Sequence, residues 1–216
     1  MIRLRVVNLG LPKSGTTTLA RALKIAGLKT ADYRIRRRQT EDPELHGAFV
    51  GKLMYDGYFH SGNPLSLMED FDAFTEINVL REGLNLWPQT DWALLDAIRK
   101  HHPGVKFLLS WRDPKAISDS MLRWSNLGLE RLPRNAIPGL PVGYGETGHE
   151  RMQWIEAHHA HMRKLFDGDA DFLEYDVADK SAPEKIGAFL GRELKWWGRA
   201  NKGPKDKPKT TGAEIS

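Results

Sequence analysis

The chain has 216 residues, a net charge of +4 from 32 Lys and Arg against 28 Asp and Glu, and no cysteine. The lack of cysteine excludes disulfides, cysteine–zinc sites and a thiol nucleophile. No run reaches the roughly 18 apolar residues that span a bilayer, and a charge interrupts the apolar start of the chain, unlike in a signal peptide. We therefore expect a cytoplasmic protein without a membrane partner.

The order of the apolar segments indicates an α/β fold. In chain order we expect a strand over 4–9, a helix over 16–26, strands over 29–35 and 72–76, a helix over 91–101, a strand over 105–111, helices over 113–124 and 150–166, a strand over 170–175 and a helix over 183–190. Strands that alternate with helices predict a P-loop-type three-layer sandwich, with a mostly parallel central sheet flanked by helices. Residues 43–71 are predicted as mixed helix and loop, and 125–148 as a loop or lid. We expect one domain over 1–204 and a disordered basic tail over 205–216.

The turn from Gly10 to Thr18 is the most informative segment of the chain. A turn rich in glycine and hydroxyl groups between a strand and a helix directs backbone N–H groups at an anion, which the helix dipole also favours. In a nucleotide P-loop, a lysine directly follows the second glycine. Here Thr16 takes that place, and Lys13 lies two residues before Gly15. The turn therefore predicts a site for a strongly ionic oxyanion other than the γ-phosphate of ATP.

Two later segments carry further candidate anion ligands. Arg112 ends an apolar strand and is followed by Asp113-Pro114 and, eight residues after the arginine, by Ser120. Asn201-Lys202-Gly203 lies near the end of the chain. In open parallel sheets, ligands bind at the carboxyl ends of the strands, and Lys13, Glu76 and Arg112 all fall there. A planar guanidinium such as that of Arg112 suits a terminal phosphate, whereas an ion pair with Asp113 is the structural alternative.

Together these segments resemble the sulfotransferases that use 3′-phosphoadenosine 5′-phosphosulfate (PAPS), over nearly the whole chain and as a bacterial or divergent branch. The resemblance implies that a Pro-Lys-Ser-Gly-Thr-Thr loop holds the 5′-phosphosulfate, and that an arginine, a serine and a late Lys-Gly turn hold the 3′-phosphate. The cofactor-binding residues so implied are Pro12, Lys13, Ser14, Gly15, Thr16, Thr17, Thr18, Arg112, Ser120, Lys202 and Gly203. Cytosolic members carry a tryptophan where Thr18 stands, so the residue that stacks on adenine is unassigned.

The resemblance also implies the chemistry. A sulfuryl group moves from PAPS to a hydroxyl or amine of a small-molecule or glycan acceptor, and 3′-phosphoadenosine 5′-phosphate (PAP) is released. Positioning of the reactants and stabilisation of charge account for most of the catalysis of such transfers. Lys13 would therefore stabilise the leaving 5′-phosphate, and no metal is required. The general base must reach the acceptor. Glu76 is the first candidate, since it ends a strand at the ligand edge; a surface pair with Arg81 is its alternative. His60 and Asp72 are the other candidates for the base.

Two other functions remain open from the sequence. One is a P-loop kinase or nucleotide hydrolase with a displaced lysine, which predicts Mg²⁺-dependent ATP binding. The other is a nucleotide- or anion-binding module that has lost its base. The basic charge favours a small anionic ligand over nucleic acid, although the Arg34 and 36–38 cluster could be only a solvated face.

Several histidines and tryptophans are predicted to have structural roles. His158, His159 and His161 share one predicted helix, which we expect to be solvated and without metal. Trp111, Trp196 and Trp197 are candidate adenine platforms, with buried packing the expected role. The remaining tryptophans considered are predicted to be core or pocket wall: Trp87, Trp92 and Trp154.

Overall fold

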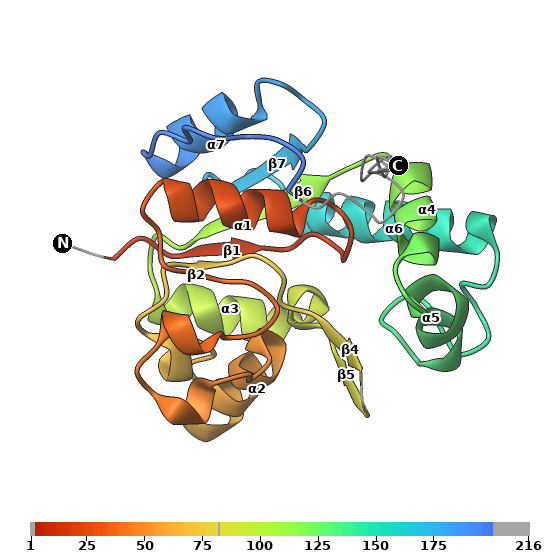
Figure 1. The fold of residues 1–216 in the computed structure, drawn as a ribbon, viewed down its shortest axis with the longest axis horizontal. Helices are drawn as coiled ribbons and strands as arrows, with labels where there is room; N and C mark the ends of the chain where they lie inside the picture. Colours follow the sequence, from red (N-terminus) through yellow and green to blue (C-terminus); the bar gives the residue numbers. More distant parts are fainter. Residues whose placement is uncertain (1–2, 82, 201–216) are drawn as a thin grey trace, which may run out of the picture.

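A sheet of five parallel strands organises the computed structural model, which describes residues 3–81 and 83–200. The strand order is β2-β3-β1-β6-β7, and every neighbouring pair in this sheet is parallel. The strands are β1 (Val6–Asn8), β2 (Thr30–Ala31), β3 (Ala73–Phe74), β6 (Lys106–Trp111) and β7 (Phe172–Asp176). The carboxyl ends of all five strands therefore meet at one edge of the sheet (Figure 1).

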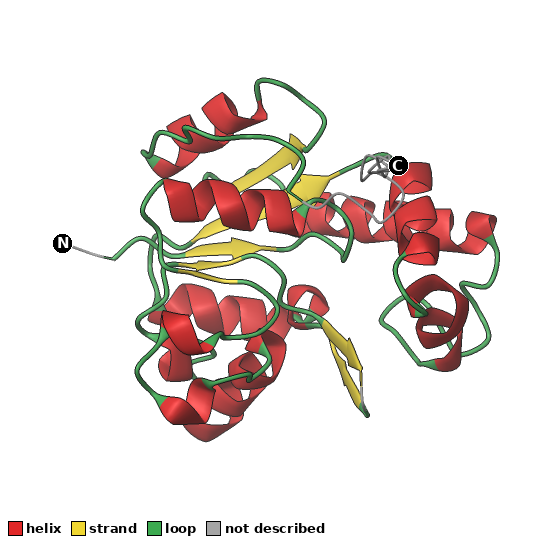
Figure 2. Cartoon of the chain, viewed as in Figure 1, coloured by secondary structure: helices red, strands yellow, loops and turns green. Residues whose placement is uncertain are grey.

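Helices cover both faces of the sheet and complete the three predicted layers (Figure 2). The helices are α1 (Thr16–Ile25), α2 (Val50–Ser61), α3 (Trp92–His101), α4 (Pro114–Arg123), α5 (Leu132–Arg134), α6 (Gly148–Leu165) and α7 (Ala182–Leu190). Helices α1 and α7 pack on one face, whereas α2, α3 and the C-terminal part of α6 pack on the other. The α/β sandwich predicted from the sequence is confirmed.

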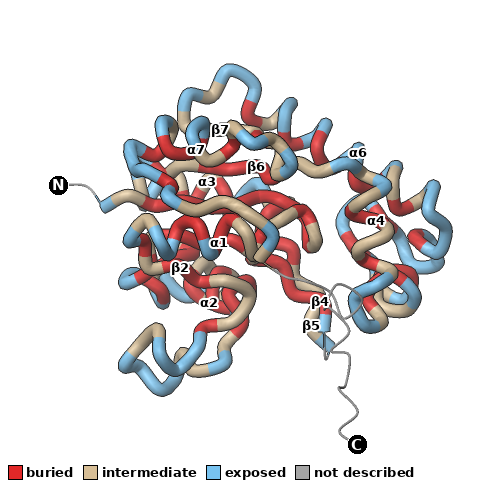
Figure 3. Tube along the Cα trace, turned by 45° about the horizontal axis from the view of Figure 1, so that its top comes forward, coloured by how far each residue is buried: buried red, intermediate tan, exposed pale blue. Residues whose placement is uncertain are grey.

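The central strand β1 shows why the sheet is covered on both sides. Val6 belongs to the cluster of α1 and α7, and contributes there with Leu23 and Ile186. The next residue, Val7, belongs to the opposite cluster with Met54 and Phe107. Successive side chains of a strand point to opposite faces, and both valines are buried, so the strand reads as a continuous apolar run. Figure 3 shows this burial along the inner strands.

A separate helical lobe lies beyond the carboxyl edge of the sheet. It contains α4, a π-helical turn over Leu127–Arg131, α5 and the N-terminal half of α6, around an apolar cluster to which Leu11, Leu80 and Trp87 also contribute. The expected loop over 125–148 is thus partly helical. Arg151 is buried in this lobe and donates to Ser118 Oγ (2.9 Å) and to the carbonyl oxygen of Gly145 (2.7 Å). These bonds join α4 to the chain that leads into α6.

An antiparallel hairpin, which the sequence did not indicate, follows β3. Its strands are β4 (Val79–Arg81) and β5 (Leu84–Leu86), and Figure 1 shows it projecting from the sheet toward the helical lobe. Arg131 donates to the carbonyl oxygen of Leu80 (2.8 Å), and Asn85 donates to that of Ala136. The hairpin therefore connects the sandwich to the lobe.

Strand β2 is shorter than the predicted 29–35 segment. The backbone of Tyr33 takes the left-handed conformation with φ 63°, which a strand cannot continue through. Its N–H donates to the carbonyl oxygen of Glu76, and its carbonyl oxygen accepts from Val50, so the chain turns here from β2 toward α2. Within the 43–71 segment, α2 is the principal helix.

Two histidines of α6 lie in the interior, so the expectation of a solvated helix face is wrong for them. His158 donates through Nε2 to the carbonyl oxygen of Leu9 (2.9 Å), and burial lowers its pKa to about 4. Burial also lowers the pKa of His159 to about 4. Glu174 lies 3.5 Å from His159, but both its oxygens accept bonds from Arg163. Both histidines are therefore neutral near pH 7.

We expect the two histidines to make folding stability fall on acidification. Their unfolded-state pKa is near 6.5, so below this value the unfolded chain binds protons that the folded chain does not, and stability is lost from about pH 6.5 toward pH 4. Each histidine should cost roughly 2 kcal/mol at pH 5 relative to pH 7.5. Urea unfolding at the two pH values measures this. His159→Leu should lose roughly 2 kcal/mol less than the wild type, and an unchanged pH dependence would contradict the assignment.

Candidate active site

The loop that follows β1 is anchored by the amide side chain of Asn8. Its Nδ2 donates to the carbonyl oxygen of Thr75 (2.9 Å), and its Oδ1 accepts from the backbone N–H of Ser110 (3.2 Å). Thr75 follows β3 and Ser110 lies in β6, so one buried side chain joins the three central strands where they end. Buried polar groups must be paired, and these bonds pair the buried amide of Asn8. They also fix the ends of the three strands from which the loop starts.

Gly10 allows the loop to approach β6 closely. A Cβ atom on Gly10 would lie 1.9 Å from the Oγ of Ser110 and 2.6 Å from that of Ser14. The two serine hydroxyls lie 2.6 Å apart in a buried hydrogen bond. His158 holds the residue before Gly10 through the Leu9 carbonyl oxygen. A side chain at position 10 would displace these groups, so the first glycine of the motif is required by packing.

The loop then adopts an anion-binding conformation. Lys13 has φ 72° and Gly15 has φ 105°, both in the left-handed region, which is rare and costly for a residue other than glycine. The N–H groups of Lys13, Gly15 and Thr16 make no hydrogen bond to any residue that the structure describes. Helix α1 begins here without an acidic residue in its first turn or a side-chain cap. Free N–H groups at a helix N-terminus bind anions.

Positive charge is concentrated at this loop. Arg112 donates through Nη1 to the carbonyl oxygen of Lys13 (3.1 Å), so the arginine contacts the loop directly. Burial lowers the pKa of Lys13, and the charges of Arg112 and Arg123 lower it further. Burial likewise lowers the pKa of Arg112, with Arg123 and Arg199 adding to the effect. Cations that disfavour one another's charge in this way are stabilised by a bound anion.

Glu76 is the acidic group of the site. Its Oε2 accepts a hydrogen bond from the Thr16 hydroxyl (2.9 Å) at the start of α1. Burial raises the pKa of Glu76 to about 7, and the nearby charge of Asp32 contributes, whereas the Thr16 hydroxyl and Lys13 oppose the rise. The carboxyl group is half-buried. A carboxylate with a pKa close to neutral can accept a proton at physiological pH.

The remaining residues of the motif lie in or next to the same anion-binding loop. Pro12 and Ser14 are buried beneath it, and Thr17 is half-buried in the first turn of α1. Thr18 donates to the carbonyl oxygen of Gly198 (2.9 Å), so the end of the described chain returns to α1. Ser120 is half-buried on α4. The loop residues and Ser120 therefore lie on elements that start at the carboxyl edge.

The late Lys-Gly turn lies outside the described residues, which end at residue 200. Lys202 and Gly203 therefore stay sequence predictions. Arg199, just before them, contributes to the positive potential at Arg112, and Gly198 contacts Thr18. The last described residues thus lie next to the start of α1, just before the Lys-Gly segment in the sequence.

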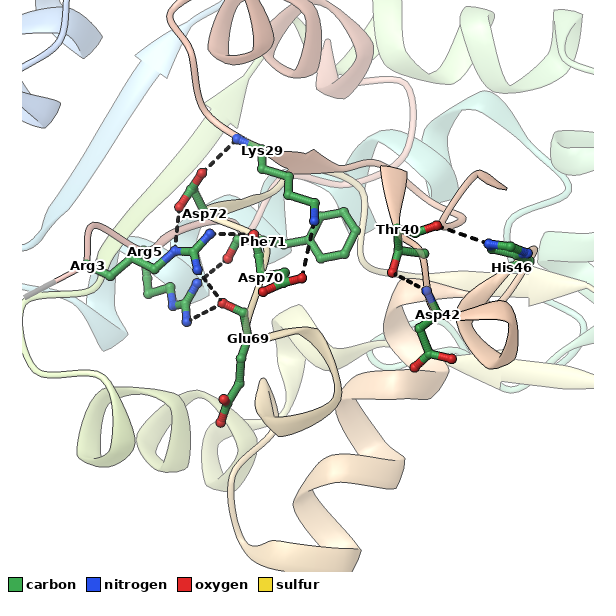
Figure 4. A network of polar contacts seen from close by, with 10 residues as sticks. All are labelled: Arg3, Arg5, Lys29, Thr40, Asp42, His46, Glu69, Asp70, Phe71 and Asp72. Carbon is green, nitrogen blue, oxygen red and sulfur yellow. Dashed lines mark hydrogen bonds and ion pairs between the residues drawn. The ribbon is translucent and has the colours of Figure 1, made fainter. Parts of the chain in front are cut away.

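Asp72 and His60 are not brought to the carboxyl edge. Asp72 precedes β3, accepts from Arg3 Nε and from the backbone N–H of Lys29 (both 2.7 Å), and belongs to the polar network of Figure 4. His60 is exposed in the last turn of α2. The next residues contact the end of α3, where Asn63 Oδ1 lies 3.0 Å from His102 Nε2. That end of α3 leads into β6, so both candidates lie toward the amino edge, where they cannot assist chemistry at Lys13.

The tryptophans divide between packing and pocket wall. Trp196 packs beneath the guanidinium of Arg21, and Trp197 makes an edge contact with Tyr175. Trp87 and Trp154 are buried and meet at 5.8 Å between ring centroids. Trp92 is 52% exposed and, with Trp87, lines a cavity of about 610 Å³ between the hairpin and the N-terminus of α3. The core and pocket-wall roles predicted for these three residues match their positions.

Some residues of the site were missed or undervalued in the sequence. Asn8 is a polar residue inside an apolar strand, and this contrast could have indicated that its side chain forms hydrogen bonds to neighbouring strands. Arg123 belongs to no motif of the sequence, yet its charge acts on both Lys13 and Arg112. Trp124 lies in none of the motifs, but its ring centroid is 3.6 Å from the Lys13 ammonium. Only the fold shows that the end of α4 returns to the loop.

Comparison with known protein families agrees with this geometry. The model of the sulfotransferase domain matches residues 5–137, which is more than half of the chain. The chain belongs to the sulfotransferase family. The matched region contains the Lys13 loop, Glu76, Arg112 and Ser120. A search of curated proteins found no match. Within the described part of this sulfotransferase, no group of three or more His, Asp or Glu side chains could hold a metal, and no helix is long and apolar enough to cross a membrane.

We expect Glu76→Gln to stabilise the sulfotransferase above neutral pH. The folded protein raises the pKa of Glu76 to about 7, so it loses stability as pH rises from the unfolded-state value near 4.5 through 7. Glutamine keeps an oxygen for the Thr16 hydroxyl but carries no charge. At pH 8 the gain should be about 1 kcal/mol after allowance for solvent screening, or roughly 2–4 °C in Tm. Thermal unfolding at pH 8 and pH 5 tests this; equal Tm differences at both would refute the assignment.

Proposed function

We propose that this sulfotransferase moves a sulfuryl group from PAPS to a hydroxyl or amine of a small-molecule or glycan acceptor. The observation that carries the proposal is the loop itself: Lys13 and Gly15 are left-handed, and N–H groups of the loop have no hydrogen-bond partner among the described residues. The charges of Arg112 and Arg123 act at the same place. The group to be bound must be strongly anionic, and the family supplies sulfuryl transfer as the chemistry. PAPS, with a phosphosulfate and a separate 3′-phosphate, fits such a site.

The loop would hold the 5′ end of the donor. PAPS supplies the sulfuryl group and, after transfer, leaves a phosphate with additional negative charge. The N–H groups of Gly15 and Thr16, together with the α1 dipole, would stabilise that phosphate. The Lys13 ammonium would neutralise the charge that develops there, which is where preorganised cations contribute most to a rate. These residues supply the positive charge without any requirement for a metal ion.

The arginines would hold the far end of the donor. Arg112 leaves the end of β6 beside the loop, and its fork can bind a terminal phosphate with two hydrogen bonds. Ser120, on α4, is the second ligand that the family resemblance implies. Arg199 adds positive potential at Arg112 and is followed by the predicted Lys202-Gly203 turn. A second anion site at Arg112 and Ser120 would distinguish PAPS from a nucleotide that has phosphates at one end only.

Glu76 would be the general base. Its pKa of about 7 lets the carboxylate take a proton from an acceptor hydroxyl or amine at neutral pH. The Thr16 hydroxyl orients one carboxylate oxygen at the start of α1, and the Lys13 charge acts on the same group. The base and the lysine that stabilises the leaving group therefore belong to one cluster.

We expect Lys13→Ala and Arg112→Ala to have different effects. Lys13→Ala should lower turnover by roughly 10²–10³-fold, as loss of a transition-state donor does, with a much smaller effect on the affinity for PAPS, whose 5′-phosphate does not yet carry the developed charge. Arg112→Ala should weaken PAP binding by about 10–100-fold because a charged hydrogen-bond partner is lost. Calorimetric titration measures binding, and PAP release from PAPS with phenol, alcohol and amine acceptors measures turnover.

Lys52→Ala is the matched control, since Lys52 pairs with Asp56 on the exposed face of α2. It should behave like the wild type in both assays. The same titration with Mg²⁺ and ATP tests the kinase or hydrolase alternative. ATP binding that depends on Mg²⁺, with no PAP binding at millimolar ligand, would falsify the PAPS assignment. PAP binding without turnover on any acceptor would favour the binding-only module.

The pH–rate profile should report the base. Protonation of Glu76 removes the acceptor of the proton, so kcat/KM should fall tenfold for each pH unit below about 7 and level off above it. Glu76→Gln should lose most activity while it retains PAP binding. His60→Gln should keep the wild-type profile, because His60 is remote from the loop. A profile that is unchanged in the Glu76→Gln variant would assign the base elsewhere.

A further inference from the structure

The Lys13 ammonium has one close partner that the sulfotransferase motif does not include. Its Nζ lies 3.6 Å from the centroid of the Trp124 ring, which is direct contact between a cation and an aromatic face. Trp124 ends helix α4, whereas Lys13 follows β1, so the two residues are 111 positions apart. No other side chain among the described residues forms a hydrogen bond with this ammonium.

The backbone of Trp124 is held by hydrogen bonds on both of its sides. The Trp124 N–H donates to the Met121 carbonyl oxygen (3.2 Å), and the Trp124 carbonyl oxygen accepts from Leu127 (3.1 Å). The following residue, Ser125, has φ 51°, a left-handed conformation that is costly for serine and is found at functional sites. The chain thus accepts local strain directly after a tryptophan that is 51% exposed.

Packing alone does not explain this arrangement. Trp124 is not a member of the buried cluster of the helical lobe, whose aromatic members are Trp87 and Trp154. Its neighbour Arg123 is also exposed and acts on the charge of Lys13. The end of α4 thus places an aromatic face and a cation at the loop. A flexible lysine side chain otherwise loses rotamer entropy when it is fixed.

We propose that Trp124 is a positioning residue that holds the Lys13 ammonium at the anion loop. The proposal rests on the proposed function for its catalytic consequence, but not for the contact. An ammonium has three N–H groups, and an aromatic face that receives one leaves two for the oxygens of a bound anion. The indole can therefore remain in place while Lys13 binds the donor phosphate. Lys13 is then preorganised where charge develops, which is the condition for electrostatic catalysis.

The contact is tested by NMR of the full chain labelled with [¹³Cε]lysine. A methylene beside an indole face has an upfield ring-current shift, so the Lys13 resonance, assigned by its loss in Lys13→Arg, should lie upfield of the other lysines. Trp124→Leu should abolish the shift, and Trp124→Phe should retain part of it. Trp92→Leu is the matched control, because Trp92 is equally exposed (52%) and lines a cavity at α3; it should leave the shift unchanged. A Lys13 resonance at the ordinary lysine position would overturn the proposal.

The consequence for catalysis is tested by kinetics and by PAP. Trp124→Leu should lower kcat roughly threefold to tenfold with little change in KM, as expected from a half-exposed cation–π contact, and Trp124→Phe should restore part of the loss. The upfield shift should persist at saturating PAP. Wild-type kcat in Trp124→Leu, or loss of the shift when PAP binds, would overturn the positioning role. If PAP does not bind at all while the shift is present, the donor assignment fails and the contact stands.

Discussion

The close approach of two strands at Gly10 is the constraint on which the site depends. Gly10 lies where a Cβ would overlap the Ser110 hydroxyl, and the Ser14–Ser110 bond closes the gap behind it. Asn8 ties the same point to β3 and to β6. With its base fixed in this way, the loop can hold Lys13 in a left-handed conformation that would otherwise relax. The anchored end of β1 thus maintains a strained turn whose backbone N–H groups have no partner within the part of the chain that the structure describes.

The electrostatics of the site follow from the fold. Parallel strands bring Glu76, Lys13 and Arg112 from three separate segments to one edge of the sheet. Burial and nearby charge of the same sign then shift them all toward neutrality: the pKa of Lys13 is lowered and that of Glu76 is raised. Before a ligand binds, the site holds charges that are costly in the folded state. A bound anion relieves the cost of the cations, and a hydrogen-bond donor beside Glu76 relieves the cost of the carboxylate.

The sequence predicted those parts of the molecule in which local pattern and chain order suffice. Three segments were placed at the correct edge, because a few consecutive residues are enough to identify an apolar strand or the start of a helix. They are the β1–loop–α1 unit, Arg112 at the end of β6 and Glu76 after β3. Asp72 precedes β3 and Glu76 follows it, so the rule that ligands bind at the carboxyl ends of parallel strands favours Glu76 and places Asp72 at the opposite edge. The hairpin after β3 and the burial of His158 depend on tertiary contacts, which produce no periodic pattern of apolar residues in the local sequence. Trp124 is the clearest case, since its contact joins two distant segments.

A crystal structure with PAP tests the central claim most directly, namely that the Lys13 loop and Arg112 hold the two phosphate ends of one nucleotide. We expect the 5′-phosphate on the N–H groups of Lys13, Gly15 and Thr16 with the ammonium alongside, and the 3′-phosphate on Arg112 and Ser120. Glu76 should face the empty sulfuryl position. A nucleotide bound elsewhere, or one bound with its 5′-phosphate remote from Lys13, would contradict the account.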